Sequence, residues 1–597
     1  MDPFAHASLR RGQHEMMAAV KEALQAKEKI LIQAPTGIGK TAAVLAPALP
    51  FIKEQGLTIF FLTSRHTQHE IVMETLRKMR ERHGIQINAA SVIGKRWLCG
   101  QKGAETLHNR DFLEYCHALR EDNKCSFYLK ASKKKDPTPE AQALLERLRC
   151  KLLSMADIKE QALACDCCPY EIATFLARNA EVIISDYYYL FNEDIRNSFF
   201  ARAQKELGKA VIIVDEAHNL ALRLRELLSS RLTVGMLARA KKEAERFRES
   251  EALQVITSVD DSMQAMSEGL GQERYAEQHE LSATDEDITL LEEAADRVRV
   301  RQQQSSIGGV ASFLQDWQGP DEGYCRVLSQ GLQLMLSYRC LDAAPAAQAV
   351  FDGCHAAVLM SGTLAPQEMH ADLLGIKGKS VTLSSPFPFA NRLNLIVPLA
   401  TTKFSERNES QYRTIGEVCS NIIAAVPGNV LLFFPSYGVL RSVLPFLKAE
   451  KPVFVEQQDR AEREQLLAAF SSRDAVLAAV SSGSFGEGID LKDNVVKAVV
   501  VVGLPLPQPD LEIKALIAHY DLKFGKGWSY GYVLPAMIKA IQNSGRCIRS
   551  ETDRGAIIFL DRRYTAPSYF CCFPPDWQLR ISRDYIKEIN SFFLKMP

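Results

Sequence analysis

The chain has 597 residues, which corresponds to roughly four domains of about 150 residues each. Its composition, 47% hydrophobic and 24% charged, is that of an ordinary globular protein and excludes a disordered or low-complexity chain. Lys plus Arg and Asp plus Glu both number 72, so the formal net charge is 0. Any nucleic-acid partner must therefore be held in a locally basic groove.

No apolar run approaches the roughly 20 residues that span a bilayer, and the first residues lack the charged and apolar regions of a secretory signal. We therefore expect a cytoplasmic protein without a membrane partner. Half of the 14 cysteines lie between Cys99 and Cys168. In a chain without an export signal, this clustering indicates a metal site rather than a disulfide framework.

Short β-branched runs, separated by helical patterns, recur in two series along the chain. The first series covers residues 29–33, 58–62, 182–185, 211–214 and 357–360, and the second covers 430–434, 475–480, 496–502 and 556–560. Such continuous apolar runs are typical of parallel strands that are buried on both faces. The pattern predicts an α/β fold with two parallel-sheet domains, divided near residue 395.

Two insertions interrupt the first series of strands. Residues 96–168 hold the clustered cysteines, and residues 228–345 are charged and favour helix. For the second insertion, a solvated helical surface domain and a direct role in substrate binding both remain open.

A glycine-containing loop follows the first predicted strand and precedes a helical pattern, which is the setting of a phosphate-binding loop. Its glycines let backbone N–H groups curl around phosphates, and the helix N-terminus favours negative charge. We expect Lys40 to reach the β- and γ-phosphates and the Thr41 hydroxyl to ligate Mg²⁺. The loop consists of Ala34, Pro35, Thr36, Gly37, Ile38, Gly39, Lys40 and Thr41, with Ala34 in place of the usual first glycine.

Asp215, Glu216 and His218 follow the strand at 211–214, at the carboxyl end where open α/β sheets bind ligands. Asp215 is suited to hold Mg²⁺, and Glu216 to orient or activate the attacking water. With the phosphate loop, they predict an ATP hydrolysis site.

The second α/β domain carries polar motifs of its own. Gly488 and Asp490 follow the strand at 475–480, while Gln542, Arg546 and Arg549 lie at a predicted helix. Arginines three apart share a helix face. Arg546 and Arg549 are therefore predicted to act as arginine fingers on the γ-phosphate across an interdomain cleft.

Five motifs occur in the order of superfamily 2 helicase motifs I, II, III, V and VI: residues 34–41, 215–218, 361–364, 486–490 and 542–549. The chain resembles the XPD/DinG family of iron–sulfur DNA helicases over nearly its whole length, and an archaeal XPD most. The resemblance implies two RecA-like motor domains, an iron–sulfur domain, a mainly helical Arch domain, and Gln13 near the adenine.

With these modules, the expected division is as follows: motor domain 1 in residues 1–95, 169–227 and 346–395, the cluster domain in 96–168, the Arch domain in 228–345 and motor domain 2 in 396–597.

Four cysteines can hold either Zn²⁺ or a [4Fe–4S] cluster. Separations of 17, 9 and 43 residues are unlike the paired short knuckles of structural zinc and favour iron. The resemblance implies Cys99, Cys116, Cys125 and Cys168 as the ligands. Cys165 and Cys167 are close enough to Cys168 in the sequence to be substitutes for it.

Candidate DNA contacts follow strands or lie among aromatic residues, where backbone contact or base stacking is possible. They are Thr63, Arg65, Tyr170, Tyr188 and Ser436.

The expected activity is that of an ATP-dependent DNA helicase that uses Mg²⁺ and a [4Fe–4S] cluster. The resemblance implies 5′ to 3′ movement and a role in DNA repair. We expect a nucleoid-associated monomer that binds single-stranded and forked duplex DNA and works with repair proteins. Two alternatives are an ATP-switched DNA-binding or damage-verification scaffold without processive unwinding, and an RNA helicase.

Overall fold

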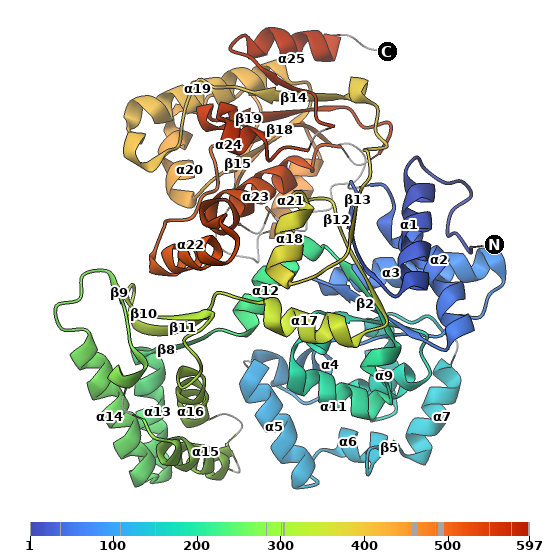
Figure 1. Cartoon of the computed structure of the whole chain (residues 1–597), viewed down its shortest axis with the longest axis vertical. Coiled ribbons are helices and arrows are strands. Elements are labelled where there is room, and N and C mark those ends of the chain that lie inside the picture. Colours follow the sequence, from blue (N-terminus) through green and yellow to red (C-terminus); the bar gives the residue numbers. More distant parts are fainter. Residues whose placement is uncertain are drawn as a thin grey trace.

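The computed structural model describes residues 2–35, 37–107, 109–149, 151–281, 283–299, 301–302, 305–456, 463–483, 485–486, 495–548, 550–574 and 576–594. Its two main bodies are the α/β layers of the two motor domains, which are stacked one above the other in Figure 1. The Arch, in green, and the cysteine insertion, in light blue, extend from the lower body.

The first motor domain is built on a parallel sheet of seven strands in the described part of the chain. The order of its strands is β13 (Lys379–Thr382), β1 (Lys29–Gln33), β12 (Ala356–Ser361), β7 (Ala210–Asp215), β2 (Thr58–Thr63), β6 (Val182–Asp186) and β3 (Ala89–Ser91). Its helices are α1 (Gln13–Ala26), α2 (Lys40–Gln55), α3 (His66–His83), α9 (Pro169–Arg178), α10 (Tyr188–Phe191), α11 (Glu193–Ala203), α12 (Leu220–Leu227), α17 (Ala344–Gly353) and α18 (Gln367–Leu374).

The second motor domain repeats this plan with seven parallel strands among its described residues. Their order is β16 (Val453–Val455), β17 (Val476–Val480), β15 (Asn429–Phe434), β18 (Val496–Val502), β19 (Gly555–Leu560), β14 (Arg392–Ile396) and β20 (Leu579–Ile581). Its helices are α19 (Glu409–Ala425), α20 (Tyr437–Val443), α21 (Arg463–Ser471), α22 (Leu511–Phe524), α23 (Leu534–Ser544), α24 (Pro567–Phe570) and α25 (Tyr585–Leu594). The prediction of two parallel α/β domains is confirmed.

The strand at 392–396 pairs with β19 and β20 of the second sheet. The second sheet therefore begins a few residues before the division expected at 395. In both domains the central strands are buried on both faces, as the uninterrupted apolar runs Val211–Val214 of β7 and Val499–Val502 of β18 show.

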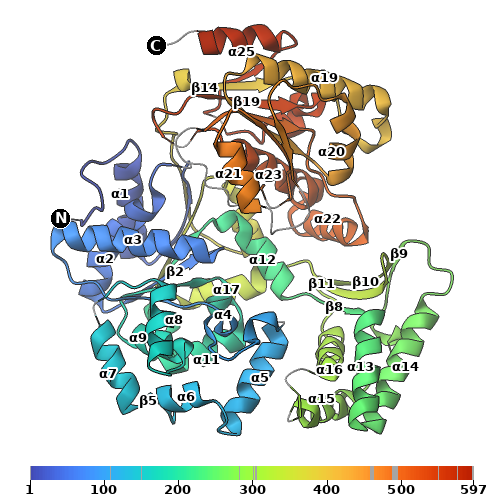
Figure 2. The same ribbon diagram turned by 180° about the vertical axis from the view of Figure 1, so that it is seen from behind.

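The cysteine insertion is a set of short helices that lies below the first sheet in Figure 2. It contains α4 (Lys95–Leu98), α5 (Asn109–Glu121), α6 (Ser126–Ala131), α7 (Pro139–Leu148) and α8 (Met155–Ala164), and the strand pair β4 (Ser132–Lys133) and β5 (Asp136–Pro137).

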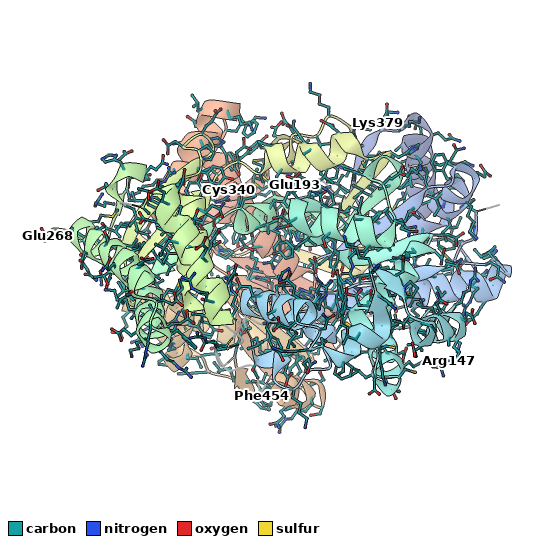
Figure 3. All side chains as sticks on the ribbon, turned by 90° about the horizontal axis from the view of Figure 1, so that it is seen from below. Arg147, Glu193, Glu268, Cys340, Lys379 and Phe454 are labelled. Atoms are coloured by element: carbon teal, nitrogen blue, oxygen red, sulfur yellow. The ribbon has the colours of Figure 1, made fainter. Side chains whose placement is uncertain are left out.

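The Arch is mainly helical, as expected, and it also contains an antiparallel sheet. The helices are α13 (Val234–Phe247), α14 (Ser250–Met266), α15 (Asp285–Arg299) and α16 (Ser306–Trp317), and the sheet order is β8 (Ser230–Thr233), β11 (Leu334–Cys340), β10 (Tyr324–Gln330) and β9 (Glu273–Tyr275). Seen from below in Figure 3, Glu268 of the Arch and Arg147 of the cysteine insertion lie on opposite sides of the molecule.

Among the helices that the structure describes, none has the length and apolar character that a bilayer crossing requires.

Candidate active site

A cavity of about 400 Å³ lies where β1 and β7 end in the first motor domain. The phosphate loop and the two carboxylates that follow β7 form one part of its wall, and the start of α3 forms another. It is lined by Arg10, Gly37, Gly39, Lys40, Thr41, Gln68, Ile71, Val72, Asp215 and Glu216. The structure thus brings together the two motifs predicted to bind and hydrolyse a nucleotide.

The phosphate loop owes its shape to two glycines and to a glutamine from another helix. Gly37 and Gly39 have φ of 82° and 85°, in the left-handed region that glycine adopts without strain. The Gln13 side chain donates to the Ile38 carbonyl at 2.7 Å, and a Cβ on Gly39 would lie 2.6 Å from Gln13 Nε2. α2 begins directly after Gly39, so its N-terminus lies beside the cavity and favours an anion there.

The other loop residues take supporting positions. Ala34 and Ile38 are fully buried, Pro35 is half-buried, and Arg10 donates from its guanidinium to the Gly37 carbonyl. Thr36 lies outside the described residues.

Asp215 and Glu216 are held at the end of β7 by a neighbouring tyrosine. The Tyr187 hydroxyl donates to the Asp215 carbonyl at 2.7 Å and to the Glu216 carbonyl at 3.1 Å. Glu216 has φ of 50°, a left-handed conformation that is uncommon for a residue with a side chain. Such strain persists where the surrounding structure fixes it, often at a functional site.

The two carboxyl groups differ in acidity because their surroundings differ. Burial, together with the adjacent Glu216, raises the pKa of Asp215 to about 7. Burial also acts to raise the pKa of Glu216, but the positive charge of Lys40, together with the hydrogen bond from Ser361, outweighs it and leaves that pKa lowered. Lys40 thus stabilises the charged form of the carboxylate predicted to orient water.

A chain of hydrogen bonds connects Glu216 with the second motor domain. Gln542 Nε2, on α23, lies 2.5 Å from His218 Nε2, His218 Nδ1 lies 2.6 Å from Ser361 Oγ, and Ser361 Oγ donates to Glu216 at 3.3 Å. An amide nitrogen only donates, so His218 Nε2 accepts and its proton is assigned to Nδ1. Gln542 also donates to Thr363 Oγ1 at 3.1 Å.

Arg546 lies on the same side of the cleft as Gln542. Its guanidinium donates to the Gly486 carbonyl at 3.0 Å, and its charge helps to lower the pKa of Glu216. Arg546 therefore lies within electrostatic reach of Glu216 in the nucleotide cavity, and its predicted contact with a γ-phosphate stays a prediction. Arg549, Gly488 and Asp490 lie outside the described residues.

The four predicted cluster cysteines come from four different helices or helix ends. Cys99 follows α4, Cys116 lies in α5, and Cys125 and Cys168 precede α6 and α9. Burial and then Cys116, Cys125 and Cys99 raise the pKa of Cys168 to about 12, so all four thiols lie within electrostatic reach of one another. Gln101 donates to the sulfurs of both Cys99, at 3.5 Å, and Cys125, at 3.6 Å.

The side chains of Cys165 and Cys167 contact residues other than the four predicted ligands. Arg147 donates to the Cys165 sulfur at 3.1 Å, and Cys167 is buried, with its thiol donating to the Lys130 carbonyl at 3.7 Å. Across the described residues, no group of three or more His, Cys, Asp or Glu side chains has the geometry to hold a single metal ion.

The candidate DNA contacts take varied positions. Thr63 is fully buried and donates to the Arg65 carbonyl, and the Ser436 hydroxyl caps α20 by accepting from Val439. Tyr170 is only 7% exposed, with Lys95 and Arg202 over its ring, so it offers no open face to a base. Arg65 and Tyr188 are half-buried.

Some contributors to the site carry no sequence signal that singles them out. Arg10 and Gln68 line the cavity, and Tyr187 fixes the carboxylate loop. Tyr187 precedes Tyr188, a candidate DNA contact, but its role under the catalytic loop depends on a contact with a residue 28 positions away along the chain.

Comparison with known proteins agrees with this arrangement. A DEAD_2 domain matches residues 61–237 and a helicase C-terminal domain matches residues 419–579. The ATP-dependent DNA helicase XPD of Sulfolobus acidocaldarius is 26% identical over 581 residues, which cover 93% of this chain and 96% of that relative. The ATP-dependent DNA helicase YoaA of Haemophilus influenzae is also 26% identical, over 94% of this chain and 92% of its own.

A solved structure described as an XPD helicase has the same fold, with a TM-score of 0.71 at 23% identity over 97% of this chain and 100% of its own. A phosphate-binding parallel-sheet domain that faces a helicase C-terminal domain defines the class of two-domain helicases. Within that class, the chain belongs to the XPD/DinG family.

Proposed function

We propose that this protein is an ATP-dependent DNA helicase that translocates 5′ to 3′ on single-stranded DNA and unwinds duplex DNA. Two relatives named as ATP-dependent DNA helicases align with more than 90% of the chain, and the cavity has the residues that nucleotide hydrolysis needs. The polarity comes from the family resemblance alone.

In the proposed reaction, the loop amides and Lys40 bind the phosphates of ATP, and Thr41 and Asp215 would hold Mg²⁺. Oxygen ligands of this kind suit that ion, which supplies charge neutralisation at the phosphates. Glu216, kept ionised by Lys40 and by the hydrogen bond from Ser361, orients the attacking water.

The observation that carries the proposal is the hydrogen-bonded chain from Gln542 through His218 and Ser361 to Glu216. It joins the second motor domain to a carboxylate of the nucleotide cavity. A change at the phosphate during hydrolysis can therefore alter how the two domains bind each other, which is the requirement for a motor. Arg546 and Arg549 are proposed to complete the closed site.

The cysteine insertion is proposed to hold a [4Fe–4S] cluster through Cys99, Cys116, Cys125 and Cys168. Four free thiols within electrostatic reach of one another, with Gln101 donating to two of them, fit that group. The cluster would brace the insertion as the wedge that parts the strands.

We place the protein in DNA repair, in the cytoplasm and with the nucleoid, as a monomer that meets other repair proteins on forked DNA. The relative from Arabidopsis thaliana, 23% identical over 99% of this chain, is named as the XPD subunit of a general transcription and DNA repair factor. The repair role rests on that name and on the family.

The proposal is tested by ATP turnover with single-stranded DNA, single-stranded RNA or no nucleic acid. DNA is expected to stimulate turnover most, and Lys40→Ala is expected to abolish turnover while single-strand binding persists. Greater stimulation by RNA would instead identify an RNA helicase. Turnover in Lys40→Ala equal to that of the wild type would contradict the assignment of the cavity.

A further inference from the structure

Trp97 is a half-exposed tryptophan on α4, two residues before the first cluster cysteine. Its exposed fraction is 50%. His66, the first residue of α3, meets the indole edge-on, with ring centroids 6.0 Å apart. Trp97 thus lies where the cysteine insertion meets the segment Thr63–Arg65 at the carboxyl end of β2.

Two basic side chains contact Trp97, one at its ring and one at its backbone. The Arg96 guanidinium lies 4.6 Å from the ring centroid and is itself anchored by donating to the Leu107 carbonyl at 2.7 Å. The Lys159 ammonium donates to the Trp97 carbonyl at 2.9 Å. The indole therefore combines an accessible aromatic surface with a local positive charge in a molecule whose net charge is 0.

The backbone holds Trp97 in place. Its amide donates to the Gly94 carbonyl at 3.0 Å, and the next residue, Leu98, is buried at 1% exposure. Scattered exposed apolar residues are common on protein surfaces. An indole fixed at its backbone, with a cation and an imidazole against its ring, is in addition pre-organised for a planar ligand.

We propose that Trp97 stacks on a base of single-stranded DNA as the strand passes from the first motor domain to the cysteine insertion. Arg96 and Lys159 attract the flanking phosphates, and His66 supports the indole edge. Single-strand binding proteins combine aromatic stacking with basic side chains in this way. This inference rests on the proposed helicase function and assigns to Trp97 the stacking role for which Tyr170 is too deeply buried.

The test is the affinity of the full-length protein, purified without oxygen, for a labelled oligo(dT), measured by fluorescence anisotropy over a range of salt concentrations. Trp97→Ala is expected to weaken binding roughly tenfold, as loss of one stacked base predicts, by the same factor at every salt concentration. Trp97→Phe keeps an aromatic face and is expected to stay within about threefold of the wild type. Lys159→Ala is expected to lower the salt slope by about 0.7, the value for one phosphate contact.

Phe404→Ala is the matched control. Phe404 is also exposed, at 85%, with Arg407 over its ring, but it lies on the second motor domain. It is expected to bind oligo(dT) like the wild type. Quenching of tryptophan fluorescence by oligo(dT), expected in the wild type and reduced in Trp97→Phe, tests the contact in a variant that keeps the aromatic packing.

Wild-type affinity in Trp97→Ala, or quenching that is unchanged in Trp97→Phe, would overturn the inference and leave the helicase proposal standing. Absence of oligo(dT) binding by the wild-type protein would instead overturn the helicase proposal and this inference with it.

Discussion

At the scale of single residues, Ser361 lies at the centre of the hydrogen-bonded chain that joins the two motor domains. Its hydroxyl contacts His218 and Glu216 and accepts from the Thr363 amide at 3.1 Å. The motif to which Ser361 belongs was evident from the sequence, as were Lys40 and Asp215. The contact between Gln542 and His218 was not, because it joins residues 324 positions apart on different domains.

Ser361→Ala is expected to lower DNA-stimulated ATP turnover about tenfold, while ATP binding stays close to that of the wild type. A hydrogen bond to a charged group contributes about 1.5–3 kcal/mol, and 1.4 kcal/mol corresponds to a tenfold change in rate. Turnover and nucleotide affinity are measured in parallel, with Ser262→Ala, at a half-buried position of α14 in the Arch, as the control. Equal loss of binding and turnover would show that Ser361 only supports the fold.

Two buried histidines make stability depend on pH. Burial lowers the pKa of both His69 and His370 to about 3, and in the described structure neither Nε2 atom has a hydrogen-bond partner. The unfolded chain takes up protons near pH 6.5, whereas the folded chain does not, so stability is greatest above that pH and is lost as the pH falls. At pH 5, each of these histidines lowers the free energy of unfolding by about 2 kcal/mol.

His370→Gln is therefore expected to lose less stability than the wild type between pH 7.5 and pH 5, as measured by urea unfolding. His14→Gln, at an exposed position, should follow the wild-type pH dependence. A fall as steep in His370→Gln as in the wild type would contradict the burial of a neutral imidazole.

At the scale of elements, the nine strands with strong apolar runs were predictable, and the weakly patterned ones were not. Edge strands such as β3, of three residues, and β13, of four, carry too little apolar pattern to be recognised. The Arch hairpin β10–β11 was missed because the charged helices around it dominate the composition of the insertion. Its Leu328 and Leu336 pair across the strands and are buried against the Arch helices, a contact that only the tertiary fold creates.

The cysteine insertion allows a direct comparison of two cysteines. Cys125→Ser is expected to remove most of the iron and to reduce strand displacement more than ATP turnover, because Cys125 is one of the four converging thiols. Cys165→Ser, whose sulfur instead contacts Arg147, is expected to keep its iron. Iron, sulfide and zinc are assayed in protein purified without oxygen.

Iron loss in both cysteine variants would indicate that the assigned ligand set is wrong. Zinc instead of iron in the wild-type protein would show that the insertion holds a zinc site and not an iron–sulfur cluster. Equal loss of ATP turnover and strand displacement in Cys125→Ser would indicate general misfolding.

At the scale of the whole molecule, the Arch forms polar contacts with both the cysteine insertion and the second motor domain. Arg299 of the Arch makes two hydrogen bonds to Glu114 of the cysteine insertion, at 2.8 and 3.0 Å. Glu512 of the second motor domain meets Arg339 of the Arch at 2.8 Å and Arg225 of the first motor domain at 3.4 Å. The Arch is therefore in direct contact with both motor domains, in agreement with its position beside both in Figures 1 and 2.

The central claim is that ATP hydrolysis between the motor domains drives the protein along single-stranded DNA. Strand displacement on two forked duplexes, one with a single 5′ tail and one with a single 3′ tail, tests it most directly when ATP and Mg²⁺ are supplied to protein purified without oxygen. We predict displacement on the 5′-tailed substrate alone. Displacement of neither substrate by protein that still hydrolyses ATP on single-stranded DNA would contradict the motor and favour an ATP-switched scaffold.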